Sequence, residues 1–480
     1  MQPNISKNPS VENRDVTIEV GGSKYVLDIF FVNSDGFFKV QPNVFKQLEF
    51  RDSIYNPFLS ITLVLKNNNN QIESNLVTTP TDVNPDNLQF EFKGNSDEFV
   101  LIKFKPDLQT GPLSEKDQFP YLLELPCFIK DEEEFEEDGV KYKLFELMDV
   151  KFRELSYPTK QWSTNQVLSD KGDFSQLSDD ERAVYTGDAL KNVIETFVSK
   201  SVINPDRWDR GLSKLFYSSS IDTTPMHIID YIIENHVSEK NSDMCLLRED
   251  KFGKLNFLSI KDIFNGIQRN KAIGSELVGS YELPTEQNEA GNDYRKPNKN
   301  ISPLISNFPV RKFNYLNFSA TSSLERLRST NVVNYSFKDK KFNFYKKEGD
   351  IKNSIDYFNK NFLTNVPAKN AHISFEPGEN VLNRNLFTTM YSTSDESIAR
   401  YEGRNELIKN MLYLSSNIEL ETNGNINLRS GKFINVIRET NIDSKFERKL
   451  QGCYFILDTQ HIINNTEYIS NVIATKPYTV

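Results

Sequence analysis

The sequence contains little of what enzymes use for catalysis. Its 480 residues include only four histidines, three cysteines and two tryptophans, so few side chains are available for general acid–base chemistry near neutral pH. No zinc-protease, nucleophile-elbow or dinucleotide-binding motif occurs. Residues 20–24 and 430–433 faintly approach a phosphate-binding loop, but they lack its glycine spacing and order. We therefore predict that the chain is not an enzyme and has no catalytic, cofactor-binding or metal-binding residues.

The cysteines and histidines show no metal-binding pattern. Cys127, Cys245 and Cys453 are odd in number, lie in apolar segments and have no C-x-x-C spacing. This pattern is typical of buried free thiols in a reducing compartment. His227 and His236 are too far apart for the i, i+4 pair of a zinc helix. We expect each of them at the surface or hydrogen-bonded in the core.

Long hydrophobic runs are also absent. No apolar segment approaches the roughly 20 residues that a membrane helix requires, and the polar residues 1–13 lack the apolar core of a signal peptide. We therefore expect a chain that is made and folded in a cytoplasm and is not inserted into a membrane.

Positive charge is in deficit. With 57 basic and 67 acidic side chains the formal net charge is -10, whereas a protein that grips a nucleic-acid backbone usually carries a basic excess. A channel through which DNA slides would instead favour acidic or neutral walls. Acidity is also the common state of soluble proteins, so the charge alone does not choose between these two interpretations.

What the sequence does contain favours β-structure. Its 35 phenylalanines and 20 tyrosines suit strands, and its length predicts two to four domains. After a flexible N-terminus at 1–14, residues 15–157 alternate strand-like segments with turns, which predicts an antiparallel barrel or sandwich. The strand candidates are 16–20, 25–30, 60–65, 88–92, 98–104, 121–129 and 142–152. The acidic run 131–138 is expected to be a solvated hairpin loop between two of them.

The middle of the chain is predicted to be helical and then mixed. In region 158–240, residues 188–198 have a helical apolar period, and Thr224 is a suitable N-cap for a second helix. Region 241–275 begins with a hairpin whose strands are 244–247 and 254–260. Region 276–400 is a mixed insertion with a long polar loop at 279–302 and strand candidates at 313–319, 332–337 and 341–345.

The last region, 401–480, has the clearest pattern. It contains a helix candidate at 405–415 and strand candidates at 417–422, 432–437, 452–458 and 468–474, with a loop around Asn464 between the last two. The alternation predicts that Tyr454, Ile456 and Ile473 face a C-terminal core, whereas Asp458 and Asn471 do not.

This order of elements resembles the end of the baseplate central hub protein of T-even-like, contractile-tailed bacteriophages. The counterparts of that family's closing hairpin are residues 454–458, 461–465 and 468–470. Two earlier parts of the chain resemble the same family, in the same order. They are the charged turn and strand of its first barrel, at 50–55 and 59–65, and its central helix and hairpin, at 223–231 and 244–249.

The resemblance implies a mainly β (α+β) fold, with two tail-tube-like antiparallel β-barrel domains and a helical and mixed middle region. The first barrel would be 15–157 and the second would be completed by 401–480, with a contribution from 241–275. It also implies a homotrimer whose six barrels mimic a tail-tube disc in the virion baseplate, assembled in the host cytoplasm. The implied partners are the cell-puncturing spike, tail-tube and baseplate wedge proteins, with genomic DNA only in transit.

Two other functions stay open at this point. One is a hub-associated tail enzyme that degrades peptidoglycan, because a glycosidase needs only two carboxylates and the chain has 67 acidic residues. The other is an unrelated β-rich virion adhesin.

Overall fold

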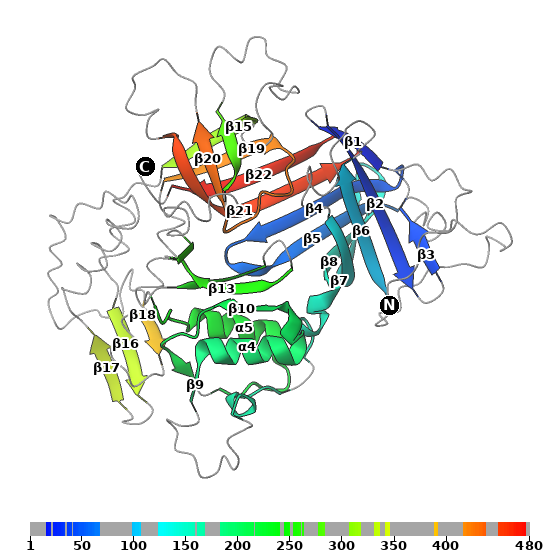
Figure 1. Ribbon diagram of the computed structural model, residues 1–480. Helices are drawn as coiled ribbons and strands as arrows, with labels where there is room; N and C mark the ends of the chain where they lie inside the picture. Colours follow the sequence, from blue (N-terminus) through cyan, green and yellow to red (C-terminus); the bar gives the residue numbers. More distant parts are fainter. Residues whose placement is uncertain are drawn as a thin grey trace.

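The protein is mainly β, as the sequence predicts (Figure 1). The computed structural model describes residues 16–20, 23–33, 36–40, 42–67, 98–106, 123–158, 161–168, 183–215, 217–240, 244–249, 253–260, 262–263, 277–283, 307–317, 331–336, 341–345, 388–391, 416–437 and 450–476. Within these residues one 14-stranded sheet dominates, and three smaller sheets accompany it.

The C-terminal part of this sheet closes into a barrel. Its strands are β14 (Leu277–Glu282), β15 (Asn307–Asn317), β19 (Ser416–Asn423), β22 (Tyr468–Thr475), β21 (Gly452–Asn464) and β20 (Phe433–Ile437), in this order around the wall. β20 then pairs with β14, so every strand has two neighbours. β14 runs parallel to both of its neighbours, and the other ladders are antiparallel. Ile418, Leu420, Tyr454, Ile456 and Val472 fill the interior.

The N-terminal part forms a second, curled antiparallel wall. Its strands are β1 (Val16–Val20), β2 (Ser23–Asn33), β6 (Phe99–Pro106), β7 (Leu123–Glu137), β8 (Val140–Asp149), β5 (Asn56–Lys66) and β4 (Phe45–Ser53), with β3 (Gly36–Lys39) beside β2. No hydrogen-bonded ladder between described residues joins β2 to β4. Their side chains close the wall instead, because Leu27 and Ile29 of β2 share one buried cluster with Phe45 and Leu48 of β4.

The long strand β21 connects the two barrels. Its first residues pair with β20, and its later residues pair with β4 from Asp458 opposite Ser53 to Asn464 opposite Gln47. The tip of the β21–β22 hairpin reaches the N-terminal core, in which Ile463 and Tyr468 are fully buried. Figure 1 shows β21 and β22 running beside β4 and β5. The last hairpin of the chain therefore belongs to both barrels.

The two barrels repeat one strand order. β2, β4, β5, β6, β7 and β8 correspond in chain order to β14, β15, β19, β20, β21 and β22, and the pairing partners correspond except at the first strand. β14 pairs with β15 and is parallel to β20, whereas no described ladder joins β2 to β4 and β2 is antiparallel to β6. The irregularities also correspond. β4 and β15 shift register at equivalent places, between Phe45 and Gln47 and between Val310 and Lys312. β7 and β21 do so between Ile129 and Asp131 and between Ile456 and Asp458.

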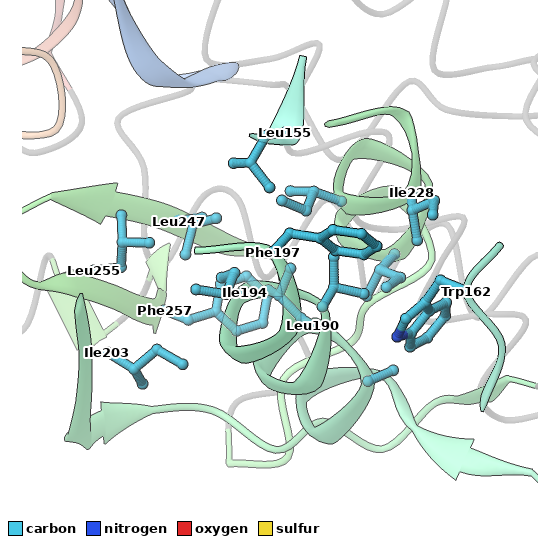
Figure 2. Packing of buried hydrophobic residues seen from close by; sticks show 14 of the residues in the cluster. Leu155, Trp162, Leu190, Ile194, Phe197, Ile203, Ile228, Leu247, Leu255 and Phe257 are labelled. Atoms are coloured by element: carbon cyan, nitrogen blue, oxygen red, sulfur yellow. The ribbon is translucent and has the colours of Figure 1, made fainter. Parts of the chain in front are cut away.

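A helical layer lies against the N-terminal barrel. Helices α4 (Thr186–Phe197) and α5 (Pro225–Glu234) pack on a sheet of β10 (Ile203–Trp208), β13 (Leu255–Ser259) and β12 (Cys245–Glu249). α5 begins where the sequence predicts, because the Thr224 side chain accepts a hydrogen bond from the His227 amide and Pro225 occupies the first turn. Figure 2 shows Leu190, Ile194 and Phe197 of α4 in one packed cluster with Phe257 and Leu247 of the sheet.

The same cluster extends into the barrel wall. Phe58 of β5, Phe128 of β7 and Met148 of β8 are buried with the helices, and the Phe58 and Phe152 rings lie 4.4 Å apart. The remaining elements are the short strands β9 (Val184–Tyr185), β11 (Lys214–Leu215), β16 (Asn331–Ser336), β17 (Lys341–Tyr345) and β18 (Thr388–Tyr391), and the 3-10 helices η3 (Val150–Leu155), η4 (Thr164–Gln166) and η7 (Lys200–Val202).

Several details differ from the sequence predictions. β21 continues to Asn464, six residues beyond the predicted strand, and β8 ends at Asp149, where η3 replaces the predicted end of the strand. The acidic run is not a loop but the exposed end of β7, and only Asp138 and Gly139, both with positive φ, form the turn. The predicted polar loop begins later, because 279–282 belong to β14. Residues 50–53 of the predicted charged turn lie in β4. Ile473 is on the outer face, because Val472 and Ala474 alternate with it and are buried.

The other barrel-closing predictions are confirmed, since Tyr454 and Ile456 are fully buried and Asp458 and Asn471 are not. The predicted helix at 405–415 and strand at 88–92 lie outside the described residues. The division of the chain at 157, 240, 275 and 400 stays a prediction.

Candidate assembly site on the shared sheet

Eight adjacent strands present one continuous face of the large sheet. In spatial order they are β7, β8, β5, β4, β21, β22, β19 and β15. Residues directly opposite each other in neighbouring strands point to the same side, so the pairings trace rows across the whole surface. One such row contains Ser60, Arg51, Gln460, Asn471, Glu421 and Lys312. We call the side of the sheet that carries this row the polar face.

The polar face is acidic. Following the same pairings, its anionic residues are Glu49, Asp131, Glu133, Glu137, Glu146, Glu419, Glu421 and Asp458, and its cationic residues are Arg51, Lys66 and Lys312. At the register shifts Lys46, Lys130 and Arg311 also reach this face, where they form ion pairs with Glu137, Glu146 and Glu467. Six cations against nine carboxylates give a formal charge of -3. The opposite side of the same strands is the apolar interior of the two barrels, with Phe50, Ile61 and Phe145 among its buried residues. The sheet is thus amphipathic across both barrels.

Side chains of the polar face connect neighbouring strands. Glu49 of β4 forms an ion pair with Arg51 and accepts a hydrogen bond of 2.8 Å from Gln460 of β21. Gln460 in turn accepts one of 3.3 Å from Asn471 of β22. The bond between Glu49 and Gln460 crosses the seam between the two barrels, so it supports the register at the place where the barrels meet.

A buried carboxylate lies beneath that seam. Asp52 of β4 is 4% exposed. One of its oxygens accepts a hydrogen bond of 3.1 Å from Arg248 of β12, and the other accepts bonds of 2.7 Å from Arg429 and 3.1 Å from the Ser430 amide. Burial alone would raise the pKa of Asp52, but the charges and hydrogen bonds of Arg429 and Arg248 outweigh it and lower the pKa to about 2. Asp52 is therefore an anion that ties three parts of the chain together.

Arg248 connects the helical layer to Asp52 and the strands around it, a site that we call the junction. Besides Asp52, its guanidinium donates to the main-chain oxygens of Ser53 and Asn56 in the β4–β5 turn. A planar guanidinium can bind several acceptors at fixed angles, which a lysine cannot do. Gly431 lies over its side chain with φ +80°, and an added Cβ would sit 3.7 Å from Arg248 Cγ. The loop between β19 and β20 therefore packs directly on the arginine.

His461 of β21 holds the same loop from the other side. It is fully buried, and its two ring nitrogens lie 2.8 Å from Ser470 Oγ and 2.8 Å from the Leu428 carbonyl. The carbonyl can only accept, so Nε2 carries the proton and Nδ1 accepts from the Ser470 hydroxyl. Burial lowers the pKa of His461 to about 4. The ring is thus neutral at pH 7 and acts as a fixed donor and acceptor.

One cluster of potential metal ligands lies elsewhere, in the helical layer. Atoms of Asp209, His236 and Cys245 are within 4.8 Å of one another and all three residues are buried. Both imidazole nitrogens of His236 already have partners, at 2.8 Å from Thr186 Oγ1 and 3.3 Å from Asp209. Asp209 also accepts hydrogen bonds from the Gly211 and Glu239 amides and from the Ser238 hydroxyl. Because these groups are already hydrogen-bonded, we interpret the cluster as a satisfied polar core.

A pocket of about 270 Å³ lies next to this cluster, between the β4–β5 turn, α5 and β12. Its walls include Tyr55, Ile233, Glu234 and Leu246 together with His236 and Cys245. Two carboxylates line it, Asp230 and Glu234, one turn apart on α5, and both are exposed to solvent instead of lying in an apolar site that would suit a general acid. The predicted absence of catalytic residues stays a prediction.

The residues that carry the junction were not singled out by the sequence. Asp52, Arg248 and Arg429 are far apart in the chain, and charged residues at such spacing give no signal until the fold is known.

Among the residues that the sequence did single out, His236 is a hydrogen-bonded core residue and His227 is exposed, as expected. Cys127 and Cys245 are buried, whereas Cys453 is half-buried. Among the described residues, no helix is long and apolar enough to cross a membrane.

No protein-family model and no curated protein sequence matches the chain. Solved structures that are similar to it include tail proteins, a phage baseplate and PdpA–VgrG complexes, and baseplate proteins of phage tails are the kind of protein that the sequence resembles. A tail protein from Neisseria meningitidis has 8% identity and a TM-score of 0.47, covering 94% of this chain and 96% of that one. A 43 kDa tail protein of prophage MuSo2 from Shewanella oneidensis has 9% identity and a TM-score of 0.43, covering 94% and 98%.

A third similar structure is the half-lidded PdpA–VgrG complex of Francisella. It has 10% identity and a TM-score of 0.38, and the match covers 95% of this chain and 59% of that one. At these TM-scores the similarities do not define an assembly for this chain. The assembly considered next rests on the strand register and charge of the chain itself.

Proposed function

We propose that this chain is a structural subunit of the central hub of a contractile-tail baseplate, in which three copies form a ring around a DNA channel. The observation that carries the proposal is the acidic polar face, which crosses eight strands of two repeated barrels and is covered by the helical layer only at one end of β5, β7 and β8. A sheet with one apolar side and one wide polar side suits a wall whose polar side faces water. The polar face would line the channel.

The width of this wall fits a channel for double-stranded DNA. Strands lie about 4.8 Å apart, so 24 strands from three copies give a circumference of about 115 Å and a backbone diameter of about 37 Å. Side chains about 5 Å long on each side leave about 27 Å, which exceeds the roughly 20 Å of a B-form duplex. Sixteen strands from two copies leave only about 14 Å and would need a large strand tilt to pass a duplex.

The charge of the polar face fits DNA in transit. A formal charge of -3 per copy repels phosphate groups, and five of the six cations of the face already form ion pairs with its carboxylates. Passing DNA would therefore slide along the wall without being held. The role of the protein would be assembly and conduction, without enzymatic turnover.

The repeated barrels suit an adaptor between two symmetries. Three chains with two similar barrels each present six similar units, which can dock a sixfold tail tube, while the threefold assembly can dock a trimeric spike. We propose the tail-tube protein, the cell-puncturing spike and the baseplate wedges as partners, and the virion baseplate, built in the host cytoplasm, as the location.

Light scattering of the purified protein, alone and mixed with the spike protein of the same virus, tests the proposal. We expect a mass of three chains, 3 × 55.5 = 166.5 kDa, in at least one of the two samples. A mass of 55.5 kDa in both samples would contradict the hub assignment.

A further inference from the structure

The structure also indicates which strands join neighbouring copies, an inference that rests on the proposed ring. Within one chain the barrels are joined by β4 and the later part of β21, from Asp458 opposite Ser53 to Asn464 opposite Gln47. In the repeat described above, β15 is the equivalent of β4, and β7 is the equivalent of β21. The strands equivalent to the internal seam therefore lie at the two outer ends of the eight-strand wall.

Both outer strands have a free edge among the described residues. β7 pairs with β6 only as far as Cys127, so from Phe128 to Glu137 its one described neighbour is β8. β15 pairs with β14 only as far as Pro309, and beyond that its one described neighbour is β19. In β21, the corresponding part beyond its pairing with β20 is the part bonded to β4. Long free edges of this kind favour pairing with another chain.

We infer that β15 of one copy pairs antiparallel with β7 of the next copy, in the register of the internal seam. The matching register shifts fix which residues meet. Asn464 and Gln47 lie opposite each other in the internal seam, and their equivalents in the repeat are Glu137 and Lys312. The next seam pair, Ile463 and Leu48, is equivalent to Glu136 and Phe313. By the same step, Phe135 lies opposite Asn314.

The charges of the two edges agree with this register. β7 carries consecutive carboxylates from Asp131 to Glu134, and Glu133, Glu134 and Glu136 have no cationic partner among the described residues. The opposing strand carries Arg311 and Lys312, and the Lys312 side chain is 77% exposed while it forms an ion pair with Glu421 of its own chain. Glu137 likewise binds Lys46 of its own chain. The proposed register adds Lys312 as a second cation beside Glu137 at the end of the ladder.

The contact joins two different surfaces, so it is heterologous and forms a ring only if the rotation between copies closes. In each copy the two edges lie at opposite ends of the eight-strand wall, roughly 30 Å apart in the ring considered above. A bond between them therefore cannot form within one chain. It can only link one copy to its neighbour.

Paired cysteines test this register directly. With Glu137→Cys and Lys312→Cys in one chain, directly opposed Cβ atoms are close enough for a disulfide. We expect mild oxidation to give a reducible three-chain species on a denaturing gel. The matched control combines Glu136→Cys with Lys312→Cys, in which the two thiols point to opposite sides of the sheet, and it should stay largely uncrosslinked, as should each single variant.

Two outcomes separate failure of this inference from failure of the proposed function. If the wild-type protein has the mass of three chains but the variant with Glu137→Cys and Lys312→Cys does not crosslink better than the control, the edge pairing is wrong and the ring can stand. If the wild-type protein stays a monomer with its spike partner present, the hub function fails as well.

Charge reversal gives a second readout that does not depend on oxidation. Lys312→Glu should place two carboxylates opposite each other and shift light-scattering masses toward 55.5 kDa at low salt. Adding Glu137→Lys should restore the trimer, because the pair is then reversed but again complementary. A double variant that associates no better than Lys312→Glu alone would overturn the inference.

Discussion

At the scale of single residues, the junction depends on a buried anion with two cationic partners. Asp52 is enclosed by Arg248 from β12 and Arg429 from the loop before β20. Such a group contributes most to specificity, because any other packing of the three parts would leave a charge buried without a partner. The sequence could not predict this site, since the three residues are brought together only by the final arrangement of both barrels and the helical layer.

Removing this charge should be costly. Asp52→Asn keeps the shape of the side chain but leaves the two guanidinium groups without a counter-charge, so we expect a loss of about 3–5 kcal/mol in the free energy of unfolding. The matched control is Asp222→Asn at an exposed position, which should change it by no more than about 0.5 kcal/mol. Urea melts of both variants at pH 7 measure the difference, and equal losses would contradict the role of Asp52.

The buried His461 predicts how stability depends on pH. Its folded-state pKa of about 4 lies below the ordinary value of 6.5, so the unfolded chain takes up a proton first as the pH falls. Stability from this group is complete above pH 6.5 and decreases by about 3 kcal/mol as the pH falls to 4. Burial also lowers the pKa of His236, which adds a loss in the same direction.

His461→Gln removes the first of these two contributions. Urea melts between pH 7 and pH 4.5 should show a smaller loss of stability for the variant than for the wild type, although the variant starts from a lower value. Parallel curves over this range would mean that His461 does not stay neutral in the folded protein.

At the scale of elements, periodicity predicted most strands and both described helices, and it failed where its assumptions failed. Alternation located β19, β20 and β22 within a residue or two of their observed limits. The acidic end of β7 was interpreted as a loop, because like charges disfavour strands. β8 pairs with it, and lysines on β8 and β4 contact its acids. The alternation argument predicted Ile473 in the core and Asn471 outside it, but residues two apart in a strand share one face, and both lie on the polar face.

Ile456 and Ile473 of the closing hairpin lie on opposite faces of the sheet and therefore give a matched pair of substitutions. Ile456 is fully buried in the C-terminal core, whereas Ile473 lies on the polar face. Ile456→Ala should cost about 2–5 kcal/mol, and the same change at Ile473 should cost less than about 1 kcal/mol. Denaturant melts decide between the two, and equal costs would mean that the register of β21 and β22 is wrong.

At the scale of the whole molecule, the resemblance seen in the sequence anticipated two barrels, but not how they are joined. The repeat lies in pairings and register shifts, such as those at Val310 and Ile456, and not in shared residues, so it is invisible before the strands are paired. The shared hairpin is a further surprise, because β21 and β22 serve the interiors of both barrels. Contacts between residues more than 400 apart, such as Glu49 with Gln460, follow from this arrangement.

The ring of three copies around an open channel is the central claim, and electron-microscopy averages of the purified assembly test it most directly. We expect a threefold ring of six similar lobes around an opening at least about 27 Å wide, set by 24 strands at about 4.8 Å. Averages that show single two-lobed particles, twofold pairs, or a ring with a filled centre would contradict the account.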